Sequence, residues 1–507
     1  MPVRPRSPAP IIIALLLTLG VVAGCSTTPQ PDATPAPAAN APELTWRPCP
    51  DDVENTENGP ARMQCATVSA PLDYDDPDGR RIDLTISRLA SANPEQRRGI
   101  LLLNPGGPGG TGLNQPTFLA DLGLPQGVLD SYDVIGMDTR GVGHSSPVSC
   151  GFTNDQNYGG NIPPYAVDDA AVTAQAQRSK DIAAQCAAND HDGILPHVTT
   201  ANMARDLDFI RAALGEDTAS FLGYSYGSGL GAAYTSLFPD HTDRVVLDSN
   251  LGDTHLDRDG LRRYALGMEQ TFPDFAAWVA ARDAEYHLGA TEEDVRQTYL
   301  RLADQLDRNP VDEVDGAMFR LSTFVALYNP ISYAATAEAW VSYLRGGSDA
   351  SARPATAPGL SPHDNAWTVF LAVTCNDFSW PTDVDVYREA VAEDRDRYPL
   401  FGAASANVFA CAFWPREDAE PPVPVGTSGP ANVLIVQNQR DPVTPLRGGQ
   451  LMNDKFDNRS RLLTIDGSGH GGYVLGTNPC AQEVVTEYLV DGTMPEQDMV
   501  CEAPRAE

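Results

Sequence analysis

The 507-residue sequence predicts an α/β fold, in which a mostly parallel sheet is flanked by helices and an inserted helical domain interrupts the chain. Three observations lead to this prediction. Short runs rich in β-branched residues and leucine end in turn residues, helical patterns lie between several of these runs, and one long stretch holds helical patterns alone. The length exceeds that of one simple domain, and 42% hydrophobic residues exclude a disordered chain.

Seven runs are predicted to be strands of the buried sheet: residues 82–87, 99–104, 132–138, 220–223, 244–248, 431–437 and 461–466. The clearest helix between strands is predicted over 200–214, where apolar residues recur at helical spacing and Gly215 takes the place of a C-terminal cap. Helical patterns without clear strands between them follow at 261–282, 292–306, 335–344 and 384–393. This second group predicts a helical cap inserted into the α/β core.

These patterns divide the chain into five parts. We expect a lipoprotein signal peptide over 1–24, a Thr/Pro/Ala-rich tether over 25–42, the first part of the core over 43–250, the helical cap over 251–425 and the C-terminal part of the core over 426–507. No internal repeat is apparent in the sequence.

The first 25 residues predict export. Arg4 and Arg6 precede an apolar run at 11–23, and small residues then lead to Cys25, as in a bacterial lipoprotein lipobox. Thirteen helical residues rise only about 20 Å, which is less than the hydrocarbon core of a bilayer, so a transmembrane span is the weaker interpretation. The other alternative is an ordinary secretory signal with an incidental cysteine. We expect an exported protein that contacts the membrane only through a lipid on Cys25, at the outer face of the cytoplasmic membrane or in the cell envelope, with release to the outside as an alternative.

The charge balance argues against one class of partner. The chain has 35 lysines and arginines against 68 aspartates and glutamates, which gives a formal net charge of -33. Phosphate backbones attract the opposite sign of charge. Nucleic acid is therefore not an expected partner.

The cysteines also favour an oxidising compartment. Eight of the nine cysteines remain when Cys25 is set aside, and they fall into neighbouring pairs along the chain. We predict four disulfides on this spacing: Cys49 with Cys65, Cys150 with Cys186, Cys375 with Cys411, and Cys480 with Cys501. The alternative is that some are buried free thiols. No Cys/His ligand cluster is apparent, so neither a metal nor an organic cofactor is expected.

A candidate nucleophile lies in the sequence Gly-Tyr-Ser-Tyr-Gly at 223–227. The motif is weak alone, but here it follows a predicted strand and precedes a predicted helix at 228–238. A strand-to-helix elbow strains the backbone of the serine and requires small residues on either side, which Gly223 and Gly227 supply. Ser225 is therefore the predicted nucleophile.

A serine nucleophile needs a base that is oriented by a carboxylate, in the chain order serine, acid, histidine. Asp441 follows a late strand, and of the eight histidines only His470 comes after it. Asp248, after the strand that follows the elbow, is the rival acid; Asp466 is too near His470 in sequence. His144 has a simpler interpretation as a loop residue. The predicted triad is Ser225, Asp441 and His470.

The oxyanion hole needs two backbone N–H groups. Tyr226, directly after the nucleophile, is expected to supply one. The loop Asn-Pro-Gly-Gly-Pro-Gly-Gly at 104–110 follows an apolar strand, and its glycines would let the backbone approach a substrate. Gly107 is expected to supply the second, although either motif alone is explained equally well by a Gly/Pro turn.

Five segments together resemble the secreted actinobacterial tripeptidyl aminopeptidases, which are relatives of the proline iminopeptidases among the α/β-hydrolase serine peptidases: 104–110, 138–145, 223–227, 441–445 and 469–473. The resemblance implies an α/β-hydrolase fold with a helical cap, and an exopeptidase that removes short peptides from free N-termini. Two residues depart from the pattern. Pro105 stands where proline iminopeptidases usually have histidine, and Ser228 where the tripeptidyl branch often has threonine.

An exopeptidase must bind the ammonium group of its substrate, which requires a carboxylate at a fixed distance from the nucleophile. Asp377, in a segment that resembles a family motif of the cap, is the predicted amine anchor; helix capping or plain surface charge explains it equally well. Thr444 has two interpretations, as a support of the Asp441 loop or as a helix N-cap before Pro445. The second suffices, so Thr444 is not included in the catalytic set.

The predicted function is a serine exopeptidase of the cell envelope, whose partner is a peptide with a free N-terminus. The alternative is a carboxylesterase or lipase with the same triad. Two further alternatives remain. An inactive binding lipoprotein is opposed by the filled triad positions, and a processing endopeptidase is opposed by the expected cap, which should block long chains.

Overall fold

The computed structural model describes residues 44–53, 63–156, 158, 162–347, 359–416 and 420–503. The predicted signal peptide, the tether and Cys25 lie outside these residues. No helix in this part of the chain combines the length and the hydrophobicity that a membrane span requires. Nor do the described residues contain a group of three or more His, Cys, Asp or Glu side chains that could hold a metal ion.

Ten described strands form one sheet in the order β1-β2-β3-β5-β4-β6-β7-β8-β9-β10. Strands β1 to β3 and the β3–β5 pair are antiparallel, and every pair from β5 to β10 is parallel. The strands are β1 Arg47–Pro48, β2 Gln64–Pro71, β3 Arg81–Leu89, β4 Gly99–Asn104, β5 Tyr132–Met137, β6 Ala219–Tyr224, β7 Thr242–Asp248, β8 Val433–Arg440, β9 Ser460–Ser468 and β10 Met499–Cys501. All seven predicted strands are present; β1, β2 and β10 were not predicted.

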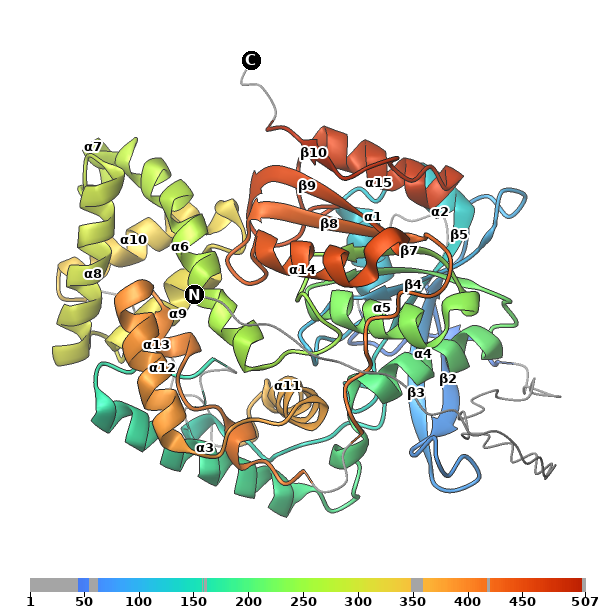
Figure 1. The fold of residues 1–507 in the computed structure, drawn as a ribbon, viewed down its shortest axis with the longest axis horizontal. Coiled ribbons are helices and arrows are strands. Elements are labelled where there is room, and N and C mark those ends of the chain that lie inside the picture. The colour runs from blue at the N-terminus through green and yellow to red at the C-terminus, as the bar shows by residue number, and fades with distance from the viewer. Residues whose placement is uncertain are drawn as a thin grey trace, which may run out of the picture. The chain divides into compact units, whose positions relative to one another are not determined.

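Helices cover both faces of the sheet (Figure 1). Successive strand residues point to opposite faces, so Phe221 lies in one hydrophobic cluster with Leu230 of α5, and Leu222 lies in another with Leu489 of α15. Burial on both faces explains why the central strands are continuous apolar runs. The covering helices are α1 Gln115–Asp121, α2 Gln126–Ser131, α4 Thr200–Ala213, α5 Tyr226–Leu237, α14 Leu446–Phe456 and α15 Pro479–Asp491.

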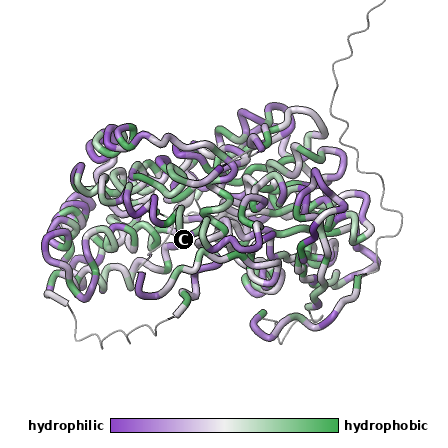
Figure 2. Tube along the Cα trace, turned by 90° about the horizontal axis from the view of Figure 1, so that it is seen from below, coloured by the Kyte–Doolittle hydropathy of each residue, from purple (hydrophilic) through white to green (hydrophobic). Residues whose placement is uncertain are grey.

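The described residues between β7 and β8 form helices and contribute no strand to the sheet. These helices are α6 Arg258–Ala280, α7 Asp283–Tyr286, α8 Glu292–Arg308, α9 Gly316–Ala326, α10 Tyr333–Leu344, α11 Asp364–Asp377, α12 Val384–Arg397 and α13 Gly402–Ser405. Hydrophobic and hydrophilic stretches alternate along the coils in Figure 2, as expected for helices that bury one side. In α8 the buried residues Val295, Tyr299, Leu302 and Leu306 recur at helical spacing.

One element of the first core segment packs against this insertion. Helix α3, Asp169–Asn189, contributes Val172 and Ala176 to a buried cluster that also contains Tyr387 and Val391 of α12. Figure 1 shows α3 beside α11 and α12. Ile182 and Cys186 of α3 belong instead to the large cluster that includes the sheet, so α3 packs against both the insertion and the core.

The structure joins the eight cysteines outside the signal region in the four pairs that spacing predicts: Cys49–Cys65, Cys150–Cys186, Cys375–Cys411 and Cys480–Cys501. Two of these bonds act close to the insertion. Cys150–Cys186 ties the chain after β5 to α3, and Cys375–Cys411 ties α11 to the short 3₁₀ helix Ala410–Phe413.

Candidate active site

Ser225 lies in a sharp turn between β6, which ends at Tyr224, and α5, which begins at Tyr226. Its φ of 57° and ψ of -122° are unfavourable for a residue with a side chain. The turn also leaves no room beside it: a Cβ on Gly223 would overlap the Gly227 carbonyl, and a Cβ on Gly227 would lie 2.8 Å from the Asn104 carbonyl oxygen. The two glycines are therefore required by close backbone contacts, as the motif predicts.

His470 and Asp441 meet at the carboxyl ends of β8 and β9. The Asp441 Oδ2 and Oδ1 atoms lie 2.9 and 3.1 Å from His470 Nδ1. Asp441 is completely buried, and its Oδ1 also accepts hydrogen bonds from the Val443 and Thr444 amides. Because the carboxylate holds Nδ1, the proton of the neutral ring belongs on Nδ1 and Nε2 is left as the basic nitrogen.

The charge of Asp441 decides the basicity of His470. Burial lowers the pKa of His470, but the Asp441 charge, its hydrogen bond and the charge of Asp248 raise this pKa by more, so that it lies above its ordinary value of 6.5. The imidazolium that forms when a serine proton is transferred is therefore stabilised before reaction.

Thr444 supports the carboxylate directly. Its hydroxyl donates to Asp441 Oδ2 at 2.9 Å and lies 3.3 Å from His470 Nδ1. Helix α14 begins at Leu446 with Pro445 at the capping position, so the alternative of Thr444 as N-cap is wrong. In the sequence, Thr444 stands three residues after Asp441. This position is as compatible with a helix cap as with a hydroxyl that supports the carboxylate, so the sequence alone does not distinguish the two roles.

The other candidates for acid and base are bound elsewhere. The Asp248 carboxylate accepts the Gly472 and Tyr473 amides, and Asp466 pairs with Arg440 at 2.9 Å. His144 lies 3.1 Å from Asp52. Of the two acids that the sequence left open, the structure places Asp441 against His470.

The loop after β4 presses on the serine elbow. A Cβ on Gly106 would lie 2.9 Å from the Ser225 Cβ and 3.2 Å from the Tyr226 nitrogen, and Gly106 has a φ of +93°. Among the described residues, no backbone carbonyl accepts a hydrogen bond from the amide of Gly107 or of Tyr226. Two backbone donors are thus left beside the nucleophile, at the two residues predicted to form the oxyanion hole.

Both oxygens of the Asp377 carboxylate are hydrogen-bonded within the protein. Its Oδ1 accepts the Thr200 amide at 2.9 Å, and its Oδ2 accepts the Thr200 hydroxyl at 2.6 Å. Burial raises the pKa of Asp377 to about 7, against the two Thr200 hydrogen bonds, which lower it. The carboxylate ties the end of α11 to the start of α4, which gives Asp377 a structural role. Its assignment as amine anchor stays a prediction.

The insertion also reaches the site through Tyr328. The Tyr328 carbonyl accepts the His470 amide at 2.8 Å, and the two rings are 5.2 Å apart in an edge-to-face arrangement. Sequence patterns give no signal for this contact, because Tyr328 follows α9 and is far from His470 along the chain. The His470 loop is therefore held by the core and the insertion together.

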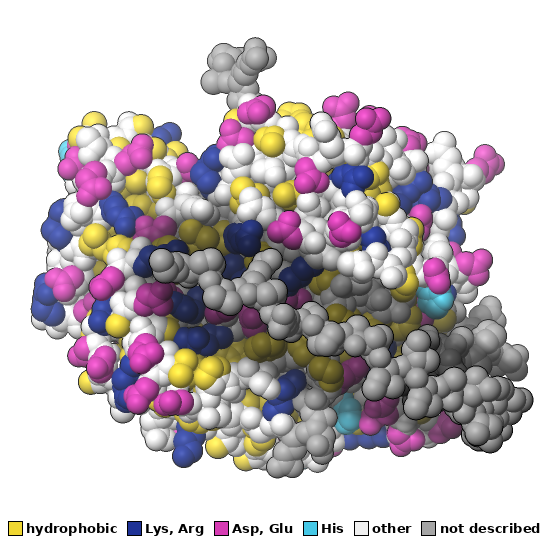
Figure 3. All heavy atoms as spheres, in the orientation of Figure 1, with side chains coloured by type: hydrophobic (Ala, Val, Ile, Leu, Met, Phe, Trp, Pro, Cys, Tyr) yellow, Lys and Arg dark blue, Asp and Glu magenta, His cyan; other side chains and the backbone are white. Residues whose placement is uncertain are grey.

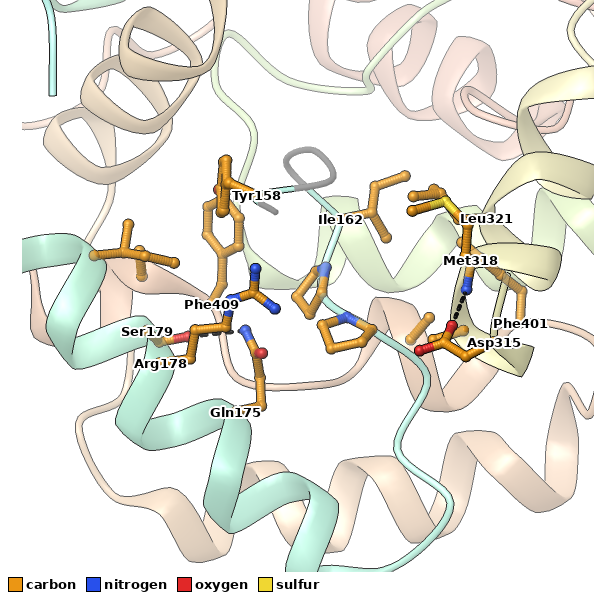
Figure 4. A pocket seen from close by; sticks show the side chains of 16 residues that line it. Tyr158, Ile162, Gln175, Arg178, Ser179, Asp315, Met318, Leu321, Phe401 and Phe409 are labelled. Carbon is orange, nitrogen blue, oxygen red and sulfur yellow. Dashed lines mark hydrogen bonds between the residues drawn. The ribbon is translucent and has the colours of Figure 1, made fainter. Parts of the chain in front are cut away.

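A cavity of about 120 Å³ lies between α3 and α9 (Figure 4). Its lining is mainly apolar and includes Ile162, Leu321 and Phe409, with Asp315 and Arg178 as its charged members. The Asp315 carboxylate accepts the Met318 amide as the N-cap of α9. No residue of the predicted triad lines this cavity, so the cavity is not part of the candidate active site.

A strained serine at the end of a parallel strand, an acid after a later strand and a histidine after the next one define a serine hydrolase of the α/β-hydrolase fold. The order of the strands in the sheet agrees with this fold, because it follows the chain order except that β4 and β5 exchange places.

Known proteins identify the family. A family model described as TAP-like protein matches residues 398–501. The chain is 36% identical to the tripeptidyl aminopeptidase of Streptomyces lividans over 91% of this chain and 87% of that protein. It is 31% identical to carboxylesterase B of Mycobacterium tuberculosis, with 98% of each chain covered, and 28% identical to the serine protease Hip1 of that species, with 96% of each covered.

Among solved structures, the chain is similar to a proline iminopeptidase of Mycobacterium smegmatis, at 14% identity and a TM-score of 0.39, over 84% of this chain and 98% of that one. The sequence relationship alone decides the family. The chain belongs to the tripeptidyl aminopeptidase family of α/β-hydrolases.

Proposed function

We propose that this protein is a serine exopeptidase of the cell envelope that hydrolyses peptide bonds near free N-termini and releases tripeptides. The observation that carries the proposal is the 36% identity to a tripeptidyl aminopeptidase along 91% of the chain. The pairing of His470 with Asp441 and the strained backbone of Ser225 after β6 support it.

The geometry supports acyl transfer by the following steps. Ser225 Oγ attacks the scissile carbonyl while His470 Nε2 accepts its proton, and Asp441 holds the imidazole. The Gly107 and Tyr226 amides bind the oxyanion. His470 then protonates the leaving amine, and water repeats the same steps on the acyl-enzyme.

We infer that the enzyme is exported and anchored by a lipid on Cys25. The basic start, the apolar run at 11–23 and the small residues before Cys25 support export and lipidation. The four disulfides fit an oxidising compartment. The peptide substrates are then those that reach the outer face of the membrane.

The decisive experiment compares peptides with a free N-terminus and the same peptides with an acetylated one. Mass spectrometry of the digests gives the cleavage position, and Ser225→Ala is the control. We expect cleavage after the third residue of free peptides only. Equal turnover of acetylated peptides would contradict the exopeptidase proposal.

A carboxylesterase is the second candidate, because one relative with 31% identity is named carboxylesterase B. Both activities use the same triad, so the acyl group that the enzyme accepts must discriminate. Rapid hydrolysis of p-nitrophenyl esters together with no cleavage of any free peptide would favour the esterase.

A further inference from the structure

Asp248 is a buried carboxylate that the mechanism above does not use. It ends β7 and has no exposed surface. Its carboxylate has no ion-pair partner among the lysines and arginines of the described residues. Such a group is costly to bury unless hydrogen-bond donors surround it.

The donors around Asp248 come from the loop that carries His470. Oδ1 accepts the Gly472 amide at 2.9 Å and the Ser249 hydroxyl at 3.0 Å. Oδ2 accepts the Tyr473 amide at 2.7 Å and also lies 3.1 Å from the Gly472 nitrogen. The side chain thus binds two consecutive amides that begin two residues after His470.

Ser249 binds the residue directly after the histidine. Its hydroxyl oxygen accepts the Gly471 amide at 2.9 Å, and its own amide donates to the Val436 carbonyl of β8. Ser249 has a φ of 57°, an unfavourable conformation that aims the side chain at the loop. Together Asp248 and Ser249 therefore bind all three amides that follow His470.

The same residue also holds the nucleophile. The backbone carbonyl of Asp248 accepts the Ser225 amide at 2.9 Å. The end of β7 is thus a common support, with the serine elbow bound to its main chain and the histidine loop bound to its side chains. A shift of this support would change the distance between nucleophile and base.

The charge of Asp248 has a second effect, on the pKa of His470. Burial raises the pKa of Asp248 to about 6, although the Tyr473 and Gly472 amides, Ser249 and the charge of His470 lower it. Above that pH the carboxylate is ionised, and its charge is one of the causes that raise the pKa of His470. The other titratable groups that face this pair are Asp441 and the Tyr328 ring, both against His470, and Tyr224, whose hydroxyl donates to the Tyr473 carbonyl.

We propose that Asp248 and Ser249 are positioning residues of the catalytic centre: they fix the His470 loop relative to Ser225, and the Asp248 charge helps to stabilise the imidazolium formed when His470 accepts the serine proton. Asp441 remains the direct partner of the ring. The proposal rests on the hydrolase function proposed above, whichever acyl group is the substrate.

The test compares three variants with the wild type. Asp248→Asn keeps the size but removes the charge and one acceptor, and Ser249→Ala removes the Gly471 acceptor but keeps the charge. Asp190→Asn is the matched control, because the half-buried Asp190 also accepts two consecutive backbone amides, those of Ile194 and Leu195, after the end of α3. Values of kcat and KM are measured from pH 5 to 10 on p-nitrophenyl acetate and on a tripeptide p-nitroanilide, with melting temperatures for each variant.

We expect Asp248→Asn to lower kcat about 100-fold on every substrate that the wild type hydrolyses, with KM little changed, because displacement of a base by about 1 Å costs that much. Loss of the negative charge lowers the pKa of His470, so the acid limb of kcat/KM moves to lower pH. Ser249→Ala should lower kcat about 10-fold without moving the limb. Asp190→Asn should lower only the melting temperature.

A folded Asp248→Asn variant with wild-type kcat and an unmoved acid limb would overturn the proposal. If Asp248→Asn does not fold, Ser249→Ala decides, and wild-type kcat in that variant would be the contrary result. The ester keeps this test separate from the exopeptidase proposal: a wild type that hydrolyses the ester but not the peptide refutes the exopeptidase, and Asp248 is still tested on the ester.

Discussion

At the scale of single residues, the site is built from carboxylates that differ in what they bind. Asp441 binds an imidazole, Asp248 binds backbone amides, and Asp377 binds a threonine. All three are buried, so burial alone does not identify the catalytic acid. The partner of each carboxylate decides its role.

Thr444 gives a sharp prediction at this scale. Thr444→Val keeps the shape but removes the hydroxyl that donates to Asp441 Oδ2, so kcat should fall about 10-fold, as expected for loss of a hydrogen bond to a charged group. Thr444→Ser keeps the hydroxyl and should retain most of the activity. Equal losses in the two variants would show that packing of the methyl group matters instead. Steady-state kinetics with a tripeptide anilide measures both.

The raised pKa of His470 predicts the pH dependence. The base must be neutral to accept the serine proton, so kcat/KM should rise with pH through a pKa above 6.5. Asp441→Asn removes the main cause of the upward shift, which should move this limb to lower pH and reduce kcat on the order of 10³- to 10⁴-fold. A pH–rate profile measures both effects, and an acid limb of Asp441→Asn at or above that of the wild type would contradict the assignment.

At the scale of elements, α11 links the insertion to the core and to the oxyanion loop. Its end is tied to α4 through Asp377 and to the segment around Cys411 through a disulfide. Near its start, the Ala366 carbonyl lies so close to Gly109 that a Cβ there would not fit. A displacement of α11 should therefore also displace the loop that carries Gly107.

Removal of the Cys375–Cys411 disulfide tests this link. The cysteines are 36 residues apart, for which the chain-entropy model gives about 4 kcal/mol of stability. We expect the double alanine variant to melt at a lower temperature and to lose part of its kcat.

The Cys49–Cys65 bond, with a separation of 16, is the matched control. The same model gives it about 3 kcal/mol, and neither of its cysteines belongs to α11. Its removal should lower stability and leave kcat unchanged. A loss of kcat of the same size in both variants would argue against a specific role of α11.

At the scale of the whole molecule, acidity is spread over the surface. Figure 3 shows aspartates and glutamates distributed across the visible face, with lysines and arginines among them. On this face the acidic residues, which outnumber the basic ones 68 to 35 in the sequence, are interspersed with them.

The proposed anchor gives the prediction for the whole molecule. Cys25→Ser removes the lipidation site, so the protein should leave the membrane fraction and the detergent phase of a Triton X-114 extract. Its kcat/KM should stay unchanged, since the catalytic residues lie in the described part of the chain, after residue 43. A Cys25→Ser protein that still enters the detergent phase would contradict lipidation at this residue.

Sequence patterns predicted the seven central strands and the pairing of the cysteines. They could not predict β1 or β10, because these short edge strands bury little apolar surface. The eight residues of β2, Gln-Cys-Ala-Thr-Val-Ser-Ala-Pro, mix small and polar residues and show no continuous hydrophobic run. The expected core segment 43–250 also includes α3, for which no helix was predicted and which packs partly against α12 of the insertion.

For the site, the sequence by itself determined the nucleophile, the histidine and the glycines of the elbow, because the elbow strain and the chain order restrict which residue types fit at those positions. Only the tertiary structure decided between Asp441 and Asp248 as the partner of His470, and only it brought Thr444 and Tyr328 to the histidine. It also showed that the Asp377 carboxylate is bound to Thr200. The physical reason is the same in each case. A carboxylate or hydroxyl takes its role from the donors and acceptors within hydrogen-bond reach, and these come from segments far apart in the chain.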